Sequence, residues 1–483
     1  MTASLTDRTR WLALMVLCLG DLMIVLDSTI VNVALPSIRT DLAFTETTLV
    51  WVVNAYMLTF GGFLLLGGRL GDLYGRRRWF LIGLALFTVA SLACGLATSQ
   101  MTLIVARAVQ GLGGAVVSAV ALSLIMTLFT EPADRAKAMG VFGFVMAGGG
   151  SIGVLLGGVL TDGLSWHWIF LVNLPVGILV AGLTFALLPA DTVGAARERL
   201  DVAGAVTVTA SLLAAVYAVV DAERVGWGSA QTLGLLAFAA ALLVAFVIIE
   251  ARASHPLVPL RLFRIRNVVT ANVVGILWST AMFAWFFLSA LYMQSVLAYT
   301  PLQVGLAFLP ANLIMGAFSL GLSAKVVMRF GIRWPLALGL ALVAAGLGAF
   351  SLAPVEGTFL VHILPGMVLL GFGVGLAFNP VLLAAMSDVA PAESGLASGV
   401  VNTAFMMGGA LGLAVLASVA AAVTGSHAAG AAIPVEALTA GYRAAFLAGA
   451  LIALLAAVIA ALFLSRAKAP PEGGGAMEPA PAH

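Results

Sequence analysis

Long apolar runs constrain this chain more than any other feature of its sequence. About 20 consecutive apolar residues form an α-helix long enough to cross a bilayer. Inside the hydrocarbon, such a helix satisfies its own backbone hydrogen bonds, which irregular chain cannot do. Charged residues make up only 9% of the chain, against about 25% in soluble domains. The sequence therefore predicts an all-α integral membrane protein.

Short polar stretches divide the apolar sequence into segments of spanning length, and we predict fourteen transmembrane helices from them. Their expected bounds are residues 11–34, 49–68, 79–97, 102–129, 138–160, 168–188, 202–220, 232–249, 269–297, 302–324, 334–353, 362–385, 396–423 and 442–464.

These segments divide the chain into four parts. We expect an N-terminal six-helix bundle over 1–190, an inserted helix pair with its linkers over 191–267, a C-terminal six-helix bundle over 268–466, and a disordered cytoplasmic tail over 467–483. A faint repeat supports the two bundles, because Gly75-Arg76-Arg77 and Gly331-Ile332-Arg333 follow matching helices of each block. Two six-helix blocks related by a pseudo-twofold axis are a known transporter plan.

The distribution of lysine and arginine predicts the orientation. Most of the 23 basic residues fall in one set of loops, whereas the opposite set holds Arg39, Arg224 and Arg443. Basic residues concentrate in cytoplasmic loops, so we expect both termini in the cytoplasm of a plasma-membrane protein.

Other features exclude several classes of function. The net charge of +2 argues against a nucleic-acid partner. The two cysteines, Cys18 and Cys94, lie in apolar runs and predict neither disulfides nor a zinc site. No Walker-type loop, nucleophile–base pair or metal-ligand set is visible, so we expect no enzyme activity and no cofactor. We expect a monomer that is embedded in the lipid bilayer.

Ionisable residues within the predicted spans are costly to bury and are therefore informative. Three stand out, namely Asp21, Asp27 and Arg107. A carboxylate that pairs with Arg107 in one state and takes a proton in another would couple proton flow to motion, whereas a static ion pair would only fix packing. Asp21 and Asp27 do not share a helix face. Asp21 is either a second titratable site or a hydrogen-bonding residue, and the sequence favours neither.

Small and polar residues line two of the predicted helices. Gln110, Gly111 and Gly114 lie three, four and seven residues after Arg107, hence on the same face, which suits a helix that lines a cavity. A second stripe of glycines allows close helix contact and is either ordinary packing or a pivot. It consists of Gly149, Gly153, Gly157 and Gly158.

The loop after the second predicted helix combines one acid with several arginines. It is either a topology determinant or a cytoplasmic latch that engages in one transport state and releases in another. Its marked residues are Gly68, Gly71, Asp72, Gly75, Arg76 and Arg77.

Several stretches match signatures of a known family. Residues 26–36 read Leu-Asp-Ser-Thr-Ile-Val-Asn-Val-Ala-Leu-Pro, and residues 68–78 match a loop signature. A helix-four signature is matched by Arg107, Gln110, Gly111 and Gly113. A Ser-Trp-Arg-Trp-Ile-Phe signature is matched by residues 165–170, with His167 in place of the arginine, and Asn173 and Pro175 follow it. By these motifs the chain, from 11 to 464, resembles the major facilitator superfamily in its 14-helix branch of drug:proton antiporters.

The resemblance implies the major facilitator fold and assigns roles. Asp27 and Arg107 would couple protons, and the Asp72 loop would be the conformational latch. The helix-five antiporter signature is incomplete, because Val154 stands where that signature has proline.

We expect proton-driven export of amphipathic organic compounds or drugs from the cytoplasm by alternating access. The alternatives are a dedicated exporter of one endogenous metabolite or antibiotic, and a non-transporting membrane sensor. The expected substrate-binding residues are Asn32, Trp51, Asn54, Tyr56, Trp285, Tyr292, Gln294, Asn379 and Met406.

Overall fold

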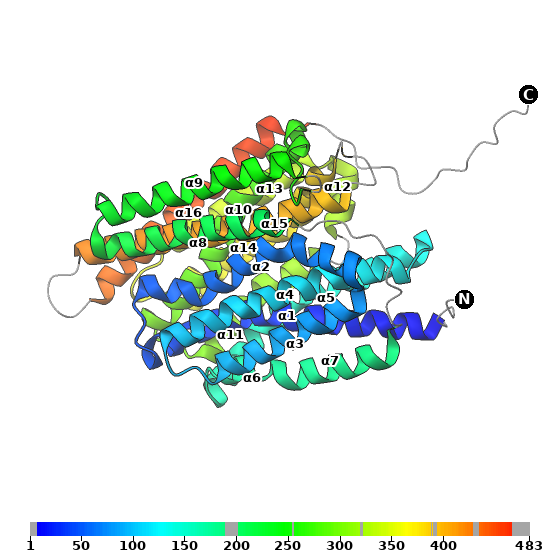
Figure 1. The fold of residues 1–483 in the computed structure, drawn as a ribbon. Helices are drawn as coiled ribbons and strands as arrows, with labels where there is room; N and C mark the ends of the chain where they lie inside the picture. The colour runs from blue at the N-terminus through cyan, green and yellow to red at the C-terminus, as the bar shows by residue number, and fades with distance from the viewer. Residues whose placement is uncertain are drawn as a thin grey trace, which may run out of the picture.

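Helices account for nearly all of the regular structure in the computed structural model of the protein. The structure describes residues 7–188, 201–253, 256–318, 322–387, 389, 394–427 and 434–465, and these contain no β-strand. The predicted all-α fold is therefore confirmed. The first described helix begins, and the last ends, toward the same end of an elongated bundle, called here the terminal end (Figure 1). The opposite end is called the distal end.

The helices follow one another with short connections. The first group comprises α1 (Asp7–Asp41), α2 (Glu46–Tyr74), α3 (Arg76–Gly95), α4 (Gln100–Leu128), α5 (Pro132–Gly163), α6 (Trp168–Leu171) and α7 (Asn173–Leu187). Next come α8 (Val202–Val225), α9 (Ala230–Arg252) and the 3-10 turn η1 (Leu260–Arg264). The last group comprises α10 (Arg266–Ser295), α11 (Pro301–Ala317), α12 (Ser323–Phe330), α13 (Arg333–Ser351), η3 (Phe359–Ile363), α14 (Leu364–Met386), α15 (Ser394–His427) and α16 (Val435–Phe463).

Each predicted span has a helical counterpart, but the count of fourteen stays a prediction. Within the described residues, twelve helices are long and apolar enough to cross a membrane. The sixth predicted span is divided into α6 and α7, which together form one candidate span, Trp168–Leu187. The two further predicted spans fall on α5 and α11, whose searched apolar stretches are shorter.

Local sequence explains where several helices begin and end. Thr45 and Thr300 are the N-cap residues of α2 and α11, and each forms a capping box with the residue three positions later. The threonine hydroxyl accepts from the backbone N–H of that residue, whose side chain accepts from the backbone N–H of the threonine. These bonds satisfy N–H groups that have no partner within the helix. Gly75 separates α2 from α3 with φ of 104°, and Gly331 separates α12 from α13 with φ of 75°. Such dihedrals favour glycine, because a side chain there would clash with the backbone. The two glycines occupy matching places in the sequence repeat.

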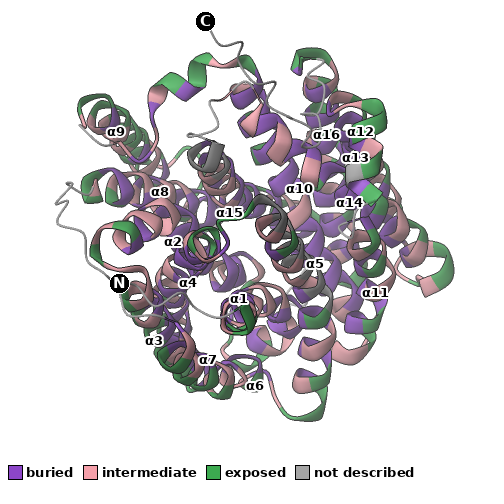
Figure 2. Cartoon of the chain, turned by 90° about the vertical axis from the view of Figure 1, so that its right-hand side faces the viewer, coloured by how far each residue is buried: buried purple, intermediate pink, exposed green. Residues whose placement is uncertain are grey.

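Packing divides the helices into two groups. Helices α1 to α7 contact one another, and helices α10 to α16 do the same. The groups meet where α5 packs against α11 and where α2 packs against α15. The inserted pair α8 and α9 lies at the edge of the bundle, with α8 in contact with both α2 and α15. Exposed residues lie mainly on the perimeter and buried residues face inward (Figure 2).

Candidate functional site

The centre of the first group holds a buried ion pair. Asp27 lies near the middle of α1 and Arg107 lies in the first third of α4. Arg107 Nη1 donates to Asp27 Oδ2 at 2.5 Å, and the two side chains are 1% and 0% exposed. The structure therefore brings together the two predicted proton-coupling residues that stand 80 positions apart. A buried charge left without its partner would be strongly destabilising.

Amide side chains hold the second oxygen of Asp27. Gln110 Nε2 and Asn173 Nδ2 donate to Asp27 Oδ1 at 2.7 and 2.9 Å. Both amides also donate to Ser91 Oγ, at 2.8 and 3.3 Å. The carboxylate thus has donors on both oxygens, supplied by α4 and α7, while α3 supplies the supporting hydroxyl. Three N–H donors therefore hold this carboxyl group in one orientation.

Arg107 is held from several directions. Its Nε donates to the carbonyl of Val52 in α2 at 2.9 Å, and its Nη1 also donates to Gln110 Oε1 at 2.6 Å. The guanidinium carbon lies 4.3 Å from the Tyr56 ring centre and 5.6 Å from that of Phe170. These contacts fix the guanidinium in position and keep accepting groups beside it if the Asp27 charge is lost.

Asp21 is a second fully buried carboxyl group on α1. Ser118 Oγ on α4 donates to Asp21 Oδ1 at 2.6 Å, while the buried Asp21 Oδ2 has no hydrogen-bond partner within the described part of the chain. The Tyr56 hydroxyl is likewise buried and unpartnered. A methyl group on Gly114 would lie 3.2 Å from that hydroxyl, so Tyr56 reaches α4 between Arg107 and Ser118. These α4 positions share one helix face.

The glycines predicted on α4 and α5 are contact points. A methyl group on Gly111 would lie 2.4 Å from the Tyr56 carbonyl oxygen, so α4 and α2 meet here almost backbone to backbone. On α5, Gly149, Gly153 and Gly157 face α1. Gly158 faces α11 instead, because a methyl group there would lie 2.8 Å from the Pro301 carbonyl oxygen. The α5 stripe therefore contacts both groups of helices.

The predicted latch loop makes its described contacts within the first group. Asp72 Oδ1 accepts from Arg76 Nε and Ser123 Oγ, both at 3.0 Å. Arg76 Nη1 also donates to Thr127 Oγ1 on α4 at 2.7 Å, and Arg77 Nη2 donates to the Phe185 carbonyl on α7 at 2.9 Å. Among the other latch residues, Gly71 packs closely against Val120, Gly68 lies against Ala119, and Gly75 forms the turn.

The predicted substrate-binding residues do not form one cluster but lie at different positions in the bundle. Asn54 on α2 donates to the Ala410 carbonyl of α15 at 2.8 Å, and Met406 of α15 packs against Gly61. Trp285 is fully buried, and its indole N–H finds no acceptor among the described residues. Trp51, Asn379 and Met406 are partly exposed. The amide of Asn32 donates to carbonyls of its own helix, at Ser28 and Thr29.

Tyr292 and Gln294 lie away from the middle of the bundle, close to the end of α10. Tyr292 donates its hydroxyl to the Pro354 carbonyl at 2.6 Å, and Gln294 Nε2 donates to the Val33 carbonyl of α1 at 2.8 Å. Gln294 therefore links the two helix groups instead of lying with the central residues.

Other polar contacts join the two helix groups at the distal end. Arg39 of α1 donates to Glu46 at 3.1 Å and to Ser295 of α10 at 3.3 Å. Tyr442 of α16 donates to the same Glu46 carboxylate at 2.8 Å. The Arg39–Glu46 bond lies within the first group, whereas the bonds from Arg39 to Ser295, from Tyr442 to Glu46 and from Gln294 to Val33 join the two groups at the distal end.

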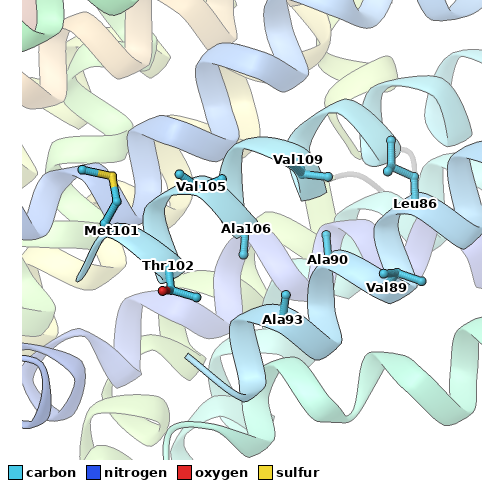
Figure 3. A pocket seen from close by; sticks show the side chains of 9 residues that line it. All are labelled: Leu86, Val89, Ala90, Ala93, Met101, Thr102, Val105, Ala106 and Val109. Atoms are coloured by element: carbon cyan, nitrogen blue, oxygen red, sulfur yellow. The ribbon is translucent and has the colours of Figure 1, made fainter. Parts of the chain in front are cut away.

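Side chains of α3 and α4 line a groove (Figure 3). It has a volume of about 490 Å³, and its walls are apolar apart from Thr102. Val89, Met101 and Val105 on its rim are all more than half exposed. It does not lie between the two helix groups, so it is not the predicted central cavity. Lipid chains would fill such a surface in a membrane.

Two residues of the central network were not predicted as site residues. Asn173 belongs to the Asn-x-Pro that follows the matched helix-six signature, so the signal was present, but no role followed from it. Ser91 lies in an apolar stretch of α3 and carries no comparable signal. Its importance appears only when α3, α4 and α7 are brought together.

Comparisons with known proteins agree with this architecture. The sequence model described as "Major Facilitator Superfamily" matches residues 17–413. The puromycin resistance protein pur8 of Streptomyces alboniger is 41% identical over 97% of this chain and 94% of its own length. The cephamycin export protein CmcT of Amycolatopsis lactamdurans is 41% identical over 96% and 95%. The multidrug resistance protein Stp of Mycobacterium tuberculosis is 39% identical over 86% and 77%.

Solved structures support the fold. A bacterial homologue of the human lysosomal transporter Spinster, in an inward-facing and unoccupied conformation, superposes with a TM-score of 0.68 at 16% identity. The comparison covers 95% of this chain and 97% of that one. A POT family peptide transporter, described as auto-inhibited, gives a TM-score of 0.65 at 18% identity, covering 95% and 96%. At these identities the likeness extends to the fold alone.

Proposed function

Since the chain belongs to the major facilitator superfamily, we propose that it is a proton-coupled antiporter that exports amphipathic organic compounds from the cytoplasm across the plasma membrane. Relatives named for resistance to puromycin, for export of cephamycin and for multidrug resistance support export. The single observation that carries proton coupling is the buried Asp27–Arg107 pair with its amide donors. Transport, and not chemical conversion, is the role this arrangement suits.

Protonation of Asp27 is the proposed switch. In the ionised state the carboxylate accepts from Arg107, Gln110 and Asn173. A proton on Asp27 removes the charge that attracts Arg107 and puts a donor where an acceptor was. Arg107 then keeps the Gln110 and Val52 oxygens as acceptors. The proton and the guanidinium thus compete for one carboxylate, which links proton binding to a change in helix contacts.

Asp21 is the proposed second proton site, on the cytoplasmic side of Asp27. The two residues are six positions apart, about 9 Å along α1. Tyr56 bridges this interval, because its ring lies against Arg107 and its unpartnered hydroxyl reaches α4 at Gly114, one turn before Ser118. An unpartnered carboxyl oxygen and an unpartnered hydroxyl are both suited to pass a proton.

The distal contacts support alternating access. If the termini are cytoplasmic, the Tyr442–Glu46, Arg39–Ser295 and Gln294–Val33 bonds lie on the outer side and hold it closed. In the proposed cycle they break when the transporter opens outward. The α5 glycines and the Asp72 loop are proposed as the pivot and the latch of this motion, with both termini remaining on the cytoplasmic side.

The test uses purified protein in liposomes with an imposed pH gradient, puromycin and a panel of lipophilic dyes. In Asp27→Asn we expect gradient-driven transport to fall to the level of empty liposomes, because an amide cannot carry the proton. Exchange of substrate for substrate, which needs no net proton movement, should persist and report a folded carrier. Asp162→Asn makes the same chemical change at an exposed residue of α5 and should behave as wild type.

Normal gradient-driven transport by Asp27→Asn would remove this residue from the mechanism. Transport of one compound alone would favour the dedicated exporter, an alternative supported by relatives named for single compounds. A folded protein that moves none of the compounds and binds none would favour the membrane sensor.

A further inference from the structure

Two carboxyl side chains meet at the terminal end of the inserted helix pair, outside the network around Asp27. Asp201 precedes α8, and its Oδ1 accepts the backbone N–H of Gly204 at 2.7 Å as the helix cap. Glu250 lies in the last turn of α9, and its Oε2 accepts the backbone N–H of Val258 at 3.0 Å. Each carboxyl group therefore uses one oxygen to hold a backbone amide.

The other two oxygens converge without a donor. Asp201 Oδ2 and Glu250 Oε1 are both buried, neither has a hydrogen-bond partner among the residues that the structure describes, and Glu250 is only 3% exposed. A methyl group on Gly204 would lie 2.7 Å from Glu250 Oε1 and 2.9 Å from Asp201 Oδ2. Both oxygens therefore lie close to a single point above Gly204. Two ionised carboxylates in this arrangement repel each other and lack solvation.

The surroundings decide what relieves this repulsion. The adjoining elements carry Arg252 on α9, Arg69 on α2 and Arg261 on η1, and the ion pairs of the described residues include neither carboxyl group. A metal ion such as Ca²⁺ takes six to eight oxygen ligands, whereas the described residues offer two open carboxyl oxygens here.

We propose that Asp201 and Glu250 share one proton, which forms a hydrogen bond between Asp201 Oδ2 and Glu250 Oε1. The proton supplies the missing donor and removes one of the two charges. The site is a further protonation site of the chain, located on the inserted helix pair and independent of Asp27 and Asp21.

The shared proton would hold the connection between α9 and α10. Val258, whose N–H Glu250 accepts, packs against two hydrophobic clusters. One contains Leu66 of α2 with Ala205 of α8, and the other contains Ala397 and Val400 of α15. Loss of the proton pushes Glu250 away from Asp201 and pulls on Val258. The connection between α9 and α10 then loosens as pH rises.

The test is thermal unfolding of the full-length protein in lipid nanodiscs between pH 5.5 and 8.5. In Glu250→Gln the amide donates permanently to Asp201, and in Asp201→Asn the amide donates permanently to Glu250, so both variants mimic the protonated pair. A carboxyl group that keeps its proton to a higher pH in the folded state than in the unfolded state contributes stability that is lost as pH rises. We therefore expect the wild-type unfolding midpoint to fall by several degrees relative to both variants toward pH 8.5.

Infrared spectroscopy supplies a readout that a purely structural role would not move. The carbonyl stretch of a protonated carboxylic acid should be present in wild type at neutral pH and weaker by one group in Glu250→Gln. Asp162→Asn is the control and should match wild type in both measurements.

Identical pH profiles for wild type and both variants would overturn the proposal. A wild-type midpoint that rises on addition of Na⁺, Mg²⁺ or Ca²⁺, with no rise in Glu250→Gln, would also overturn it and indicate a metal-cation site. Neither measurement needs a substrate, so the result does not depend on the proposed transport activity.

Discussion

Replacing Arg107 by methionine tests whether the buried ion pair behaves as one electrostatic unit. Methionine keeps an unbranched apolar chain but removes the charge and the donors. Asp27 would keep Gln110 and Asn173 as donors, while its charge would stay fully buried without a counter-ion. The variant therefore isolates the cost of an uncompensated buried carboxylate.

The expected magnitude follows from this burial. Removing one partner of a buried ion pair typically costs about 3–5 kcal/mol. At about 1.4 kcal/mol per factor of ten, the folded population relative to the unfolded one falls by a hundred-fold to several thousand-fold. Adding Asp27→Asn removes the orphaned charge, and Gln110 Oε1, freed from Arg107, can accept from the new amide. The double variant should then regain about 2 kcal/mol or more relative to Arg107→Met alone.

The assay is reversible unfolding in mixed micelles with increasing denaturing detergent, for wild type, both single variants and the double variant. Arg107→Met should also gain stability relative to wild type as pH falls, because protonation neutralises Asp27. Strictly additive effects of the two substitutions, with no pH dependence of the Arg107→Met penalty, would refute the reasoning.

Two further substitutions test the proposed moving parts. Asp72→Ala removes the acceptor for Arg76 and Ser123, so we expect slower turnover in liposomes with little change in substrate affinity, and a loss of affinity at unchanged turnover would contradict the latch. Gly153→Ala would bring a methyl group to 2.1 Å from Thr29 Oγ1 and 3.0 Å from the Leu26 carbonyl oxygen, whereas Gly150→Ala meets nothing nearer than 3.9 Å. Overpacking typically costs about 1–3 kcal/mol. Gly153→Ala should therefore unfold at a lower concentration of denaturing detergent than Gly150→Ala. Equal stabilities of the two variants would show that α1 and α5 are not tightly packed at Gly153.

The cost of burying charge explains which site residues the sequence reveals. Asp27 and Arg107 stand out because charges are rare inside apolar runs, and Gln110 follows from its helical spacing to Arg107. Ser91 could not be found in this way, because serine is unremarkable in a membrane helix and its role depends on how α3 meets α4 and α7. Gln294 was expected among the central residues, but its depth depends on where α10 ends.

The same limit applies to the Asp201–Glu250 pair. Each residue lies at a helix end, where acids are ordinary caps or solvated groups. Only the antiparallel packing of α8 on α9 brings the two carboxyl groups over Gly204. Sequence periodicity gives the faces of helices well, but it does not give the contacts between their ends.

The neighbouring glycines Gly157 and Gly158 give α5 two separable interfaces. Gly157 meets the backbone of α1 within its own helix group, whereas Gly158 meets the backbone of α11 in the other group. In the proposed transport cycle, a larger side chain at 158 would therefore alter the balance between inward-open and outward-open populations without contacting Asp27 or Arg107. Under that proposal, side-chain volume at a single position sets which of the two conformations the resting protein prefers.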